Sequence, residues 1–229
     1  MLADLKGQFI SQRQNTELTQ FVPIRNKDAW SINYKNDTIH IKDNTFSAKQ
    51  YAVDVWGCQF NANEVSEEIS QWFSDKLNIP CRLLVMPNKE TRIKAFQKPP
   101  YKTTVSFADG YPILTLGTAS LSNLNQKLDT PISADRFRAN ILIETSESHN
   151  EDTWTDFKIG NELVCRNIKP CVRCQVITID QESGIKGLEP SKTLSSYRKF
   201  ENGICFGSNV IVLKEGKIKV GDKISLISE

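Results

Sequence analysis

The stretch Ile168-Lys-Pro-Cys171-Val-Arg173-Cys174-Gln-Val-Ile-Thr-Ile-Asp180 is the most informative part of this sequence. Apolar and polar side chains alternate after Cys174, and this pattern predicts a strand that begins directly behind the cysteine. The Cys174 sulfur is then expected at the mouth of a sheet. Lys169 and Arg173 lie beside it in the sequence, and a nearby cation stabilises the thiolate that binds a soft metal or attacks an electrophile. Cys174 is therefore the leading candidate for chemistry, with Cys171 as a supporting thiol.

Three other interpretations of the cysteines stay open at this point. A lone cysteine is often buried and unreactive. Structural zinc usually takes two close pairs of thiolates, whereas only Cys171 and Cys174 have that spacing, with Cys165 and Cys205 as further donors. A thioredoxin-like redox pair shares the Cys-x-x-Cys spacing, but that motif begins a helix, and a strand is expected here.

Short strands are predicted along most of the chain. In the second half, strands are expected at residues 137–143, 162–168, 175–180, 209–213 and 223–227, two more lie around the turn Asp109-Gly110 within 103–116, and a helix opens at Thr118. In the first half, we expect a hairpin at 30–41, strands at 53–57 and 81–86, and a helix after an Asn63 N-cap. Many short strands with turn residues between them favour a barrel-like domain.

This order of elements predicts an α+β protein that is mainly β. A smaller α/β domain is expected at residues 1–86 and a β-barrel-like domain at 101–229. The segment between them, residues 87–100, is polar, contains three prolines and shows no period. It is interpreted as a linker or a long exposed loop.

Composition excludes several classes of protein. The chain has 229 residues, of which 39% are hydrophobic and 24% charged, as in ordinary globular proteins. A net charge of +2 gives no general attraction to nucleic acids or membranes, and no apolar run approaches the roughly 20 residues of a membrane helix.

The start, Met1-Leu-Ala-Asp-Leu-Lys-Gly7, lacks a secretory signal, and six cysteines are too few for a disulfide scaffold. We expect a cytoplasmic protein with reduced thiols and with no nucleic-acid or membrane partner.

Several short motifs together resemble one family, the MOSC domain (molybdenum cofactor sulfurase C-terminal) of the mitochondrial amidoxime-reducing component and its bacterial relatives. The motifs of the second half are Lys-Pro-Cys-x-Arg-Cys-x5-Asp, Ser183-Gly184, Leu194-Ser-Ser-Tyr197-Arg198, Phe206-Gly207, Val220-Gly221-Asp222, Arg136-Phe-Arg138-Ala-Asn140-Ile and Glu151-Asp152-x-Trp154. In the first half, Ser11-Gln12-Arg13 and Val55-Trp56-Gly57 resemble the MOSC N-terminal domain. The resemblance covers nearly the whole chain.

The resemblance implies a site for the molybdenum cofactor, a molybdenum ion held by a pterin dithiolene. Cys174 corresponds to the single protein ligand of the metal, and a thiolate suits this sulfur-rich centre. Arg138 and Asn140 correspond to residues that hold the pterin and its phosphate, and a guanidinium offers phosphate a fork of donors. Gly110 corresponds to a cofactor-facing loop, and Arg173 is counted with the cofactor contacts.

The function implied is reduction of small N-hydroxylated substrates such as amidoximes, hydroxylamines and hydroxylated bases. Because the chain shows no iron–sulfur module, electrons are expected from a separate protein of the ferredoxin or cytochrome b5 type. The alternatives are a non-catalytic module that carries sulfur or cofactor on Cys174, or an inactive fragment without cofactor. Pyridoxal phosphate belongs to the wider family through fusion to a sulfurase domain, and no lysine-centred site for it is seen here.

The sequence departs from the family at its beginning. Family members carry a lysine-serine pair and an arginine-rich strand before the motif in which this chain starts, and both contact the cofactor. We therefore expect the N-terminal domain to be truncated at its start, with an incomplete set of cofactor contacts.

Overall fold

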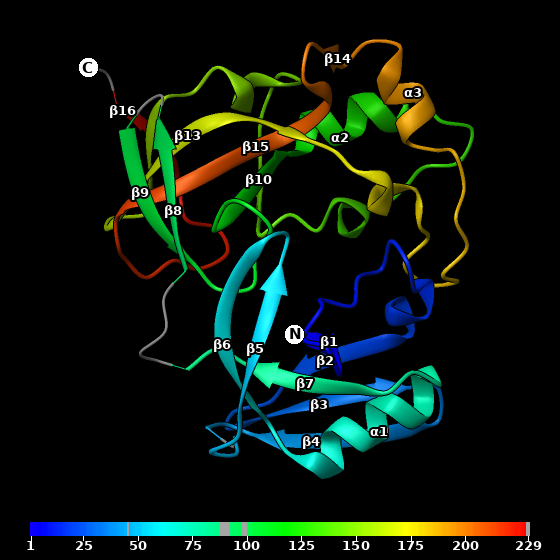
Figure 1. Cartoon of the computed structure of the whole chain (residues 1–229). Helices are drawn as coiled ribbons and strands as arrows, with labels where there is room; N and C mark the ends of the chain where they lie inside the picture. The colour runs from blue at the N-terminus through cyan, green and yellow to red at the C-terminus, as the bar shows by residue number, and fades with distance from the viewer. Residues whose placement is uncertain (45, 88–91, 98–99, 228–229) are drawn as a thin grey trace. The chain divides into compact units, whose positions relative to one another are not determined.

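The computed structural model describes residues 1–44, 46–87, 92–97 and 100–227 (Figure 1). The chain divides into two compact units. The N-terminal unit comprises Met1–Arg92 together with Ile179–Lys186, and the C-terminal unit comprises Ile93–Thr178 and Gly187–Glu229. Among the described residues, no helix combines the length and the apolar composition needed to cross a bilayer.

The N-terminal unit contains one α-helix and two antiparallel sheets within the described residues. Its elements are β1 (Leu2–Asp4), the 3-10 helix η1 (Thr16–Gln20), β2 (Phe21–Arg25), β3 (Ala29–Tyr34), β4 (Asp37–Lys42), β5 (Gln50–Val55), β6 (Cys58–Glu64), α1 (Glu67–Leu77) and β7 (Cys81–Val85). The strand orders are β1-β7-β6-β5 and β2-β3-β4. The predicted hairpin at 30–41 is confirmed as β3 and β4, which turn at Lys35 and Asn36.

Helix α1 supplies the core of this unit. Its apolar face, with Ile69, Phe73 and Leu77, packs on β7 and on the β2-β3-β4 sheet. The helix was expected from its apolar spacing, but the predicted N-cap is wrong. Asn63 belongs to β6, and its side-chain amide donates to the carbonyl of Ser47. Ser66 caps the helix instead, because its hydroxyl accepts from the backbone N–H of Ile69 at 3.1 Å.

The C-terminal unit is mainly β. Its elements are β8 (Arg92–Gln97), β9 (Pro100–Val105), β10 (Ile113–Gly117), α2 (Thr118–Asn125), η2 (Ala134–Phe137), β11 (Ile141–Ile143), η3 (Asn150–Asp152), β12 (Asp156–Ile159), β13 (Leu163–Val172), η4 (Gln175–Thr178), α3 (Ser191–Ser195), β14 (Lys199–Phe200), β15 (Gly203–Lys214) and β16 (Ile224–Ile227). The main sheet has the order β11-β10-β15-β13-β12-β16.

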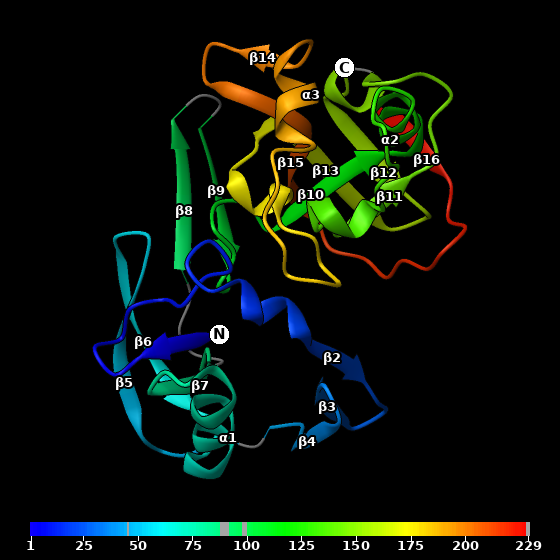
Figure 2. The same cartoon turned by 90° about the vertical axis from the view of Figure 1, so that its right-hand side faces the viewer.

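This main sheet is curled, as Figure 2 shows. Ile141 on β11 and Ile224 on β16 come from its two ends, yet both pack against one cluster around Phe157 and Cys165. The long strands β13 and β15 form its centre, and bulges interrupt their pairing. All pairs along this order are antiparallel except β10 and β11, which are parallel. A curled, bulged and mainly antiparallel sheet fits the expected barrel-like class.

Two of the predicted strands in this unit differ from the structure. Residues 175–178 form the 3-10 helix η4, in which Ile177 and Thr178 are buried. The expected strand at 137–143 is confined to β11, because Arg138 adopts a left-handed backbone with φ of 54° that closes η2. In both places a short helical turn directs apolar side chains into the core, and an alternating pattern does not distinguish this from a strand.

The expected linker at residues 87–100 is partly strand. β8 lies inside that segment and pairs with β9. The prediction of an aperiodic loop over the whole segment is therefore wrong. Residues 88–91 and 98–99 lie outside the described residues. The prolines flank β8 and leave its backbone donors intact. The domain limits at 86 and 101 stay a prediction.

The segment Ile179–Lys186 returns from the second half of the chain to the N-terminal unit. Its carbonyl at Glu182 accepts a 2.7 Å hydrogen bond from the side chain of Gln20. The carboxylate of Asp180 accepts from the backbone and the hydroxyl of Ser183 at 2.9 and 2.8 Å. Asp180 therefore fixes the turn.

Candidate functional site

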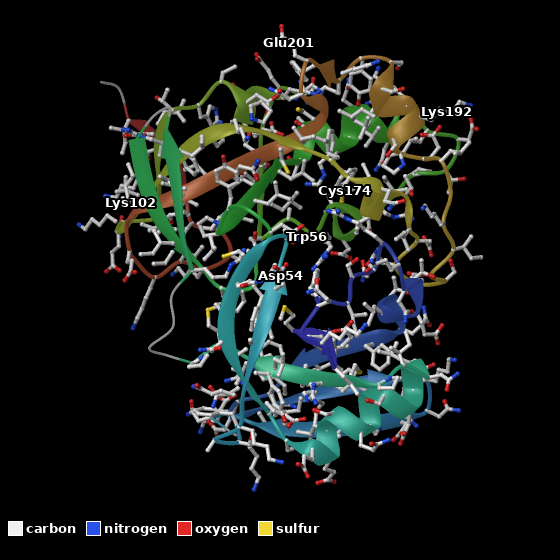
Figure 3. The ribbon with its side chains drawn as sticks, viewed as in Figure 1. Asp54, Trp56, Lys102, Cys174, Lys192 and Glu201 are labelled. Carbon is white, nitrogen blue, oxygen red and sulfur yellow. The ribbon has the colours of Figure 1, made fainter. Side chains whose placement is uncertain are left out.

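Cys174 lies at the corner between the end of β13 and the start of η4 (Figure 3). It is the one cysteine classed as exposed among the described residues. Its thiol has no hydrogen-bond partner in that part of the chain. The sequence placed this sulfur at the mouth of a sheet before a strand, whereas the structure places it behind a strand and before a 3-10 helix. In either arrangement, the sulfur is accessible to a ligand.

The cations expected beside Cys174 point elsewhere. The guanidinium of Arg173 donates from Nη1 to the Cys171 sulfur at 3.2 Å and from Nη2 to the carbonyl of Phe137 at 2.7 Å. The Lys169 ammonium lies 5.8 Å from the centre of the Tyr111 ring. The two cations that were expected to stabilise the Cys174 thiolate therefore contact Cys171 and Tyr111 instead.

The segment that carries Arg138 is held at both ends. Phe137 is buried, and its ring lies 4.5 Å from that of Phe206. Asn140 forms two hydrogen bonds with Leu114 on β10, accepting from the backbone N–H at 2.8 Å and donating its own to the carbonyl at 2.9 Å. Between these anchors, Arg138 is exposed and its guanidinium has no partner among the described residues.

The structure brings the Arg138 and Cys174 segments together. Helix η2 ends one residue before Arg138, helix η4 begins one residue after Cys174, and the two helices contact each other. The Asn140 carboxamide oxygen is used to bind the backbone, which leaves its Nδ2 group as the available donor. These residues place a free thiol and a free guanidinium on adjacent turns of one unit.

Gly110 lies in a bend before β10, next to Tyr111. Apart from its two chain neighbours, no described residue places a heavy atom within 4 Å of the position that a Cβ would take at Gly110, so this face of the loop is open to the described part of the chain. Burial raises the pKa of Tyr111, and the neighbouring Cys171 adds to the rise. The loop that carries Gly110 and Tyr111 therefore lies close to Cys171, which precedes Cys174 by three residues.

The remaining thiols of this unit are structural. Cys165 and Cys205 are buried, and burial raises the pKa of both, in Cys165 to about 11. No group of three or more His, Cys, Asp or Glu side chains in the described part of the chain is arranged to hold a metal ion. The zinc interpretation has no support there, whereas a metal that takes one protein thiolate is compatible. The argument against a redox pair, that a strand follows Cys174, is wrong because η4 follows.

The sequence did not assign roles to two acidic residues of η3 in the same unit. The carboxylate of Glu151 is 1% exposed and accepts from the Ser120 hydroxyl at 2.7 Å and from the backbone N–H of Gly117 at 3.0 Å. The neighbouring Asp152 pairs with the buried guanidinium of Arg198. Both residues lie in the quoted motifs, but no local signal shows that their partners are distant in the sequence.

The MOSC domain family model matches residues 102–225. The chain belongs to the MOSC-domain family. The mitochondrial amidoxime-reducing component 1 of Homo sapiens is 27% identical over 247 residues, which cover 100% of this MOSC-domain chain and 72% of that protein. Component 2 of Bos taurus is 30% identical over 191 residues, or 78% of this chain and 56% of its own length. The molybdenum cofactor sulfurase of Oryza sativa subsp. japonica is 31% identical over 68% of this chain and 21% of that protein. The chain thus spans between about half and three-quarters of the amidoxime-reducing components and a fifth of the sulfurase.

The residues at this corner of the MOSC-domain chain fit a pterin-bound molybdenum in their chemistry. An accessible thiol without a protein partner can become a thiolate ligand, and thiolates suit soft, sulfur-rich metal centres. A guanidinium without a partner can bind phosphate with two parallel donors. Each terminal nitrogen of Arg173 makes one hydrogen bond, to Cys171 or to Phe137, and keeps a second N–H, so its role as a cofactor contact stays a prediction.

Proposed function

We propose that this chain binds a molybdenum cofactor through the Cys174 thiolate and reduces small N-hydroxylated substrates with it. The observation that carries the proposal is the position of an exposed thiol and an exposed guanidinium, which have no partners among the described residues, directly beside the contacting helices η2 and η4. Membership of the MOSC family supports it, as do the names of the amidoxime-reducing relatives.

Each residue has a separate task in this proposal. Cys174 loses its proton and anchors the metal, and as a ligand it tunes the metal's potential. Arg138 binds the phosphate of the cofactor, with its side-chain direction set by the left-handed backbone at that residue. The Asn140 Nδ2 group donates to the pterin, and Gly110 allows close approach because it presents no side chain.

When bound, the cofactor supplies two-electron redox chemistry at the metal. The reaction removes the oxygen of the substrate N–O bond as water and consumes two electrons and two protons. A separate electron-transfer protein of the ferredoxin or cytochrome b5 type supplies the electrons. The cytoplasmic location expected from the sequence is part of the same proposal, and fractionation of the source cells tests it.

Turnover of an aromatic amidoxime tests the activity. The protein is purified from a host that makes the cofactor, reduced with a chemical electron donor, and assayed chromatographically for the amidine product. Wild-type protein and the Cys58→Ser control, which changes a half-buried thiol of the N-terminal unit, should form product, whereas Cys174→Ser should form none. Equal turnover by Cys174→Ser, or no turnover by wild-type protein that contains molybdenum, would overturn the proposed reaction.

A second candidate function is sulfur transfer, in which Cys174 carries a persulfide. The exposed thiol and the match to a plant molybdenum cofactor sulfurase favour it. A persulfide releases thiocyanate when it is treated with cyanide. Cyanide-releasable sulfur that depends on Cys174, in protein without molybdenum, would select this function over reduction.

A further inference from the structure

The Arg173 side chain connects two segments of the C-terminal unit that are far apart in the sequence. Its Nη2 group donates to the Phe137 carbonyl, 36 residues away, and its Nη1 group donates to the Cys171 sulfur. The guanidinium carbon also lies 5.6 Å from the centre of the Phe137 ring. One side chain therefore contacts both the segment that precedes Arg138 and the segment that precedes Cys174.

The backbone around Arg173 is fixed as well. Its N–H donates to the carbonyl of Ile204 on β15 at 2.7 Å. Its Nε atom is buried and has no hydrogen-bond partner in the described part of the chain. A buried donor without a partner is unfavourable. Because Nε does not help to hold the guanidinium in place, its position is determined by its two Nη contacts.

We infer that Arg173 is a positioning residue, which holds Cys174 and Arg138 in fixed relation to each other. The inference rests on the proposed role of Cys174 as the metal ligand. The planar fork of arginine can reach a carbonyl oxygen and a sulfur at the same time, whereas the single ammonium of lysine cannot reproduce both directions. The residue needed at this position is therefore arginine specifically, and positive charge alone is not sufficient.

The first test uses Arg173→Lys, which keeps the charge and removes the fork. In cofactor-free protein, hydrogen exchange should accelerate at two amides that report the two segments, Arg138, which donates to Asp135, and Ile177, which donates to Cys174. The loss of charge-assisted hydrogen bonds should raise the exchange rates of these two amides by roughly tenfold or more. Amides of the β3–β4 hairpin in the N-terminal unit should not change. Unchanged exchange at both Arg138 and Ile177 would overturn the inference.

The second test measures molybdenum per chain after dilution and gel filtration. Arg173→Lys should retain less molybdenum than wild-type protein by about tenfold. The control is Arg166→Lys on β13, which breaks a two-point ion pair with Asp156 on β12 and should retain the wild-type amount. Retention by Arg173→Lys equal to that of the control would show that charge alone suffices and would overturn the inference.

A further variant keeps the inference testable if Arg173→Lys folds poorly. Cys171→Ala removes one of the two Nη contacts and leaves arginine in place, so its loss of molybdenum should be smaller. Adding Cys171→Ala to Arg173→Lys should cause no further loss, because the shared contact is already broken. Losses that multiply would mean that the two residues act separately, contrary to the inference. If Cys174→Ser keeps its molybdenum, the proposed function fails, while the exchange result still decides whether Arg173 connects the two segments.

Discussion

The backbone N–H of Gly117 donates a hydrogen bond of 3.0 Å to Oε1 of the buried Glu151 carboxylate. Gly117 is the N-cap of α2 and has no side chain with which to cap it. The carboxylate from η3 therefore takes the place of a capping side chain, and its negative charge is favourable at a helix N-terminus. This contact ties the junction between β10 and α2 to η3.

Replacing Gly117 by alanine tests how closely this contact is packed. A Cβ there would lie 2.6 Å from Glu151 Oε2 and 2.8 Å from Thr145 Oγ1, and Glu151 cannot move without losing its hydrogen bonds. We expect a loss of about 1–3 kcal/mol in the free energy of unfolding, measured by urea denaturation. Gly110→Ala is the matched control, because its Cβ meets open space, and it should be neutral. Equal stability of the two variants would contradict this packing.

The pair between Asp152 and Arg198 should be strongly coupled. Arg198 is buried and also donates from Nε to the carbonyl of Cys205 at 3.1 Å. Removing one partner of a buried ion pair leaves an uncompensated charge, so Asp152→Asn and Arg198→Gln should each lower the unfolding free energy by about 3–5 kcal/mol. The double variant should lose clearly less than the sum. A double-mutant cycle by thermal or urea unfolding measures this, and strict additivity would argue against the pair.

The stability of the C-terminal unit should depend on His149 at mildly acidic pH. Burial, followed by the charge of Arg198, lowers the pKa of His149 from its ordinary value of 6.5. The unfolded chain then binds a proton at a higher pH than the folded chain does. Stability is therefore full above about pH 6.5 and declines, by up to about 1.4 kcal/mol per pH unit, as the pH falls toward the folded-state pKa.

Urea unfolding at a series of pH values measures that decline. In His149→Gln the part of the slope due to this residue should disappear. An identical pH dependence in wild-type and variant protein would show that the imidazole is not buried as described.

The thiols should react in the order of their exposure. Iodoacetamide at neutral pH should alkylate Cys174 first, because it is exposed and has no described partner. Cys165 should not react until the protein unfolds, since it is buried and its pKa is about 11. Peptide mass spectrometry over time gives the order, with urea-unfolded protein as the control. Alkylation of Cys165 in the folded chain at the rate of Cys174 would refute this account of their environments.

Local patterns predicted the main elements of the fold but not the short helical turns. The apolar spacing of Ile69, Phe73 and Leu77 identified α1, since a long amphipathic period is unambiguous. The N-cap was assigned to Asn63 because a polar residue before a helix does not reveal that β6 extends to Glu64. The segment 175–178 was assigned to a strand because a single 3-10 turn is too short to show a period.

The candidate site shows the same division between local and distant information. The motif at residues 168–174 singled out Cys174 as the candidate, and this residue is exposed in the structure. The motif could not show that Arg173 reaches Phe137, because that contact depends on the packing of two 3-10 helices far apart in the sequence. The motif also could not show that the carboxamide oxygen of Asn140, a residue expected to hold the cofactor, accepts from the backbone of β10.

The central claim is that Cys174 is the protein ligand of a molybdenum cofactor, and metal analysis tests it most directly. Wild-type protein, Cys174→Ser and Cys58→Ser are purified in parallel from a cofactor-producing host, and molybdenum per chain is measured by mass spectrometry. Circular dichroism checks that all three are folded. We predict molybdenum in the wild-type and Cys58→Ser proteins and almost none in folded Cys174→Ser. A folded Cys174→Ser protein with the wild-type molybdenum content would contradict the claim.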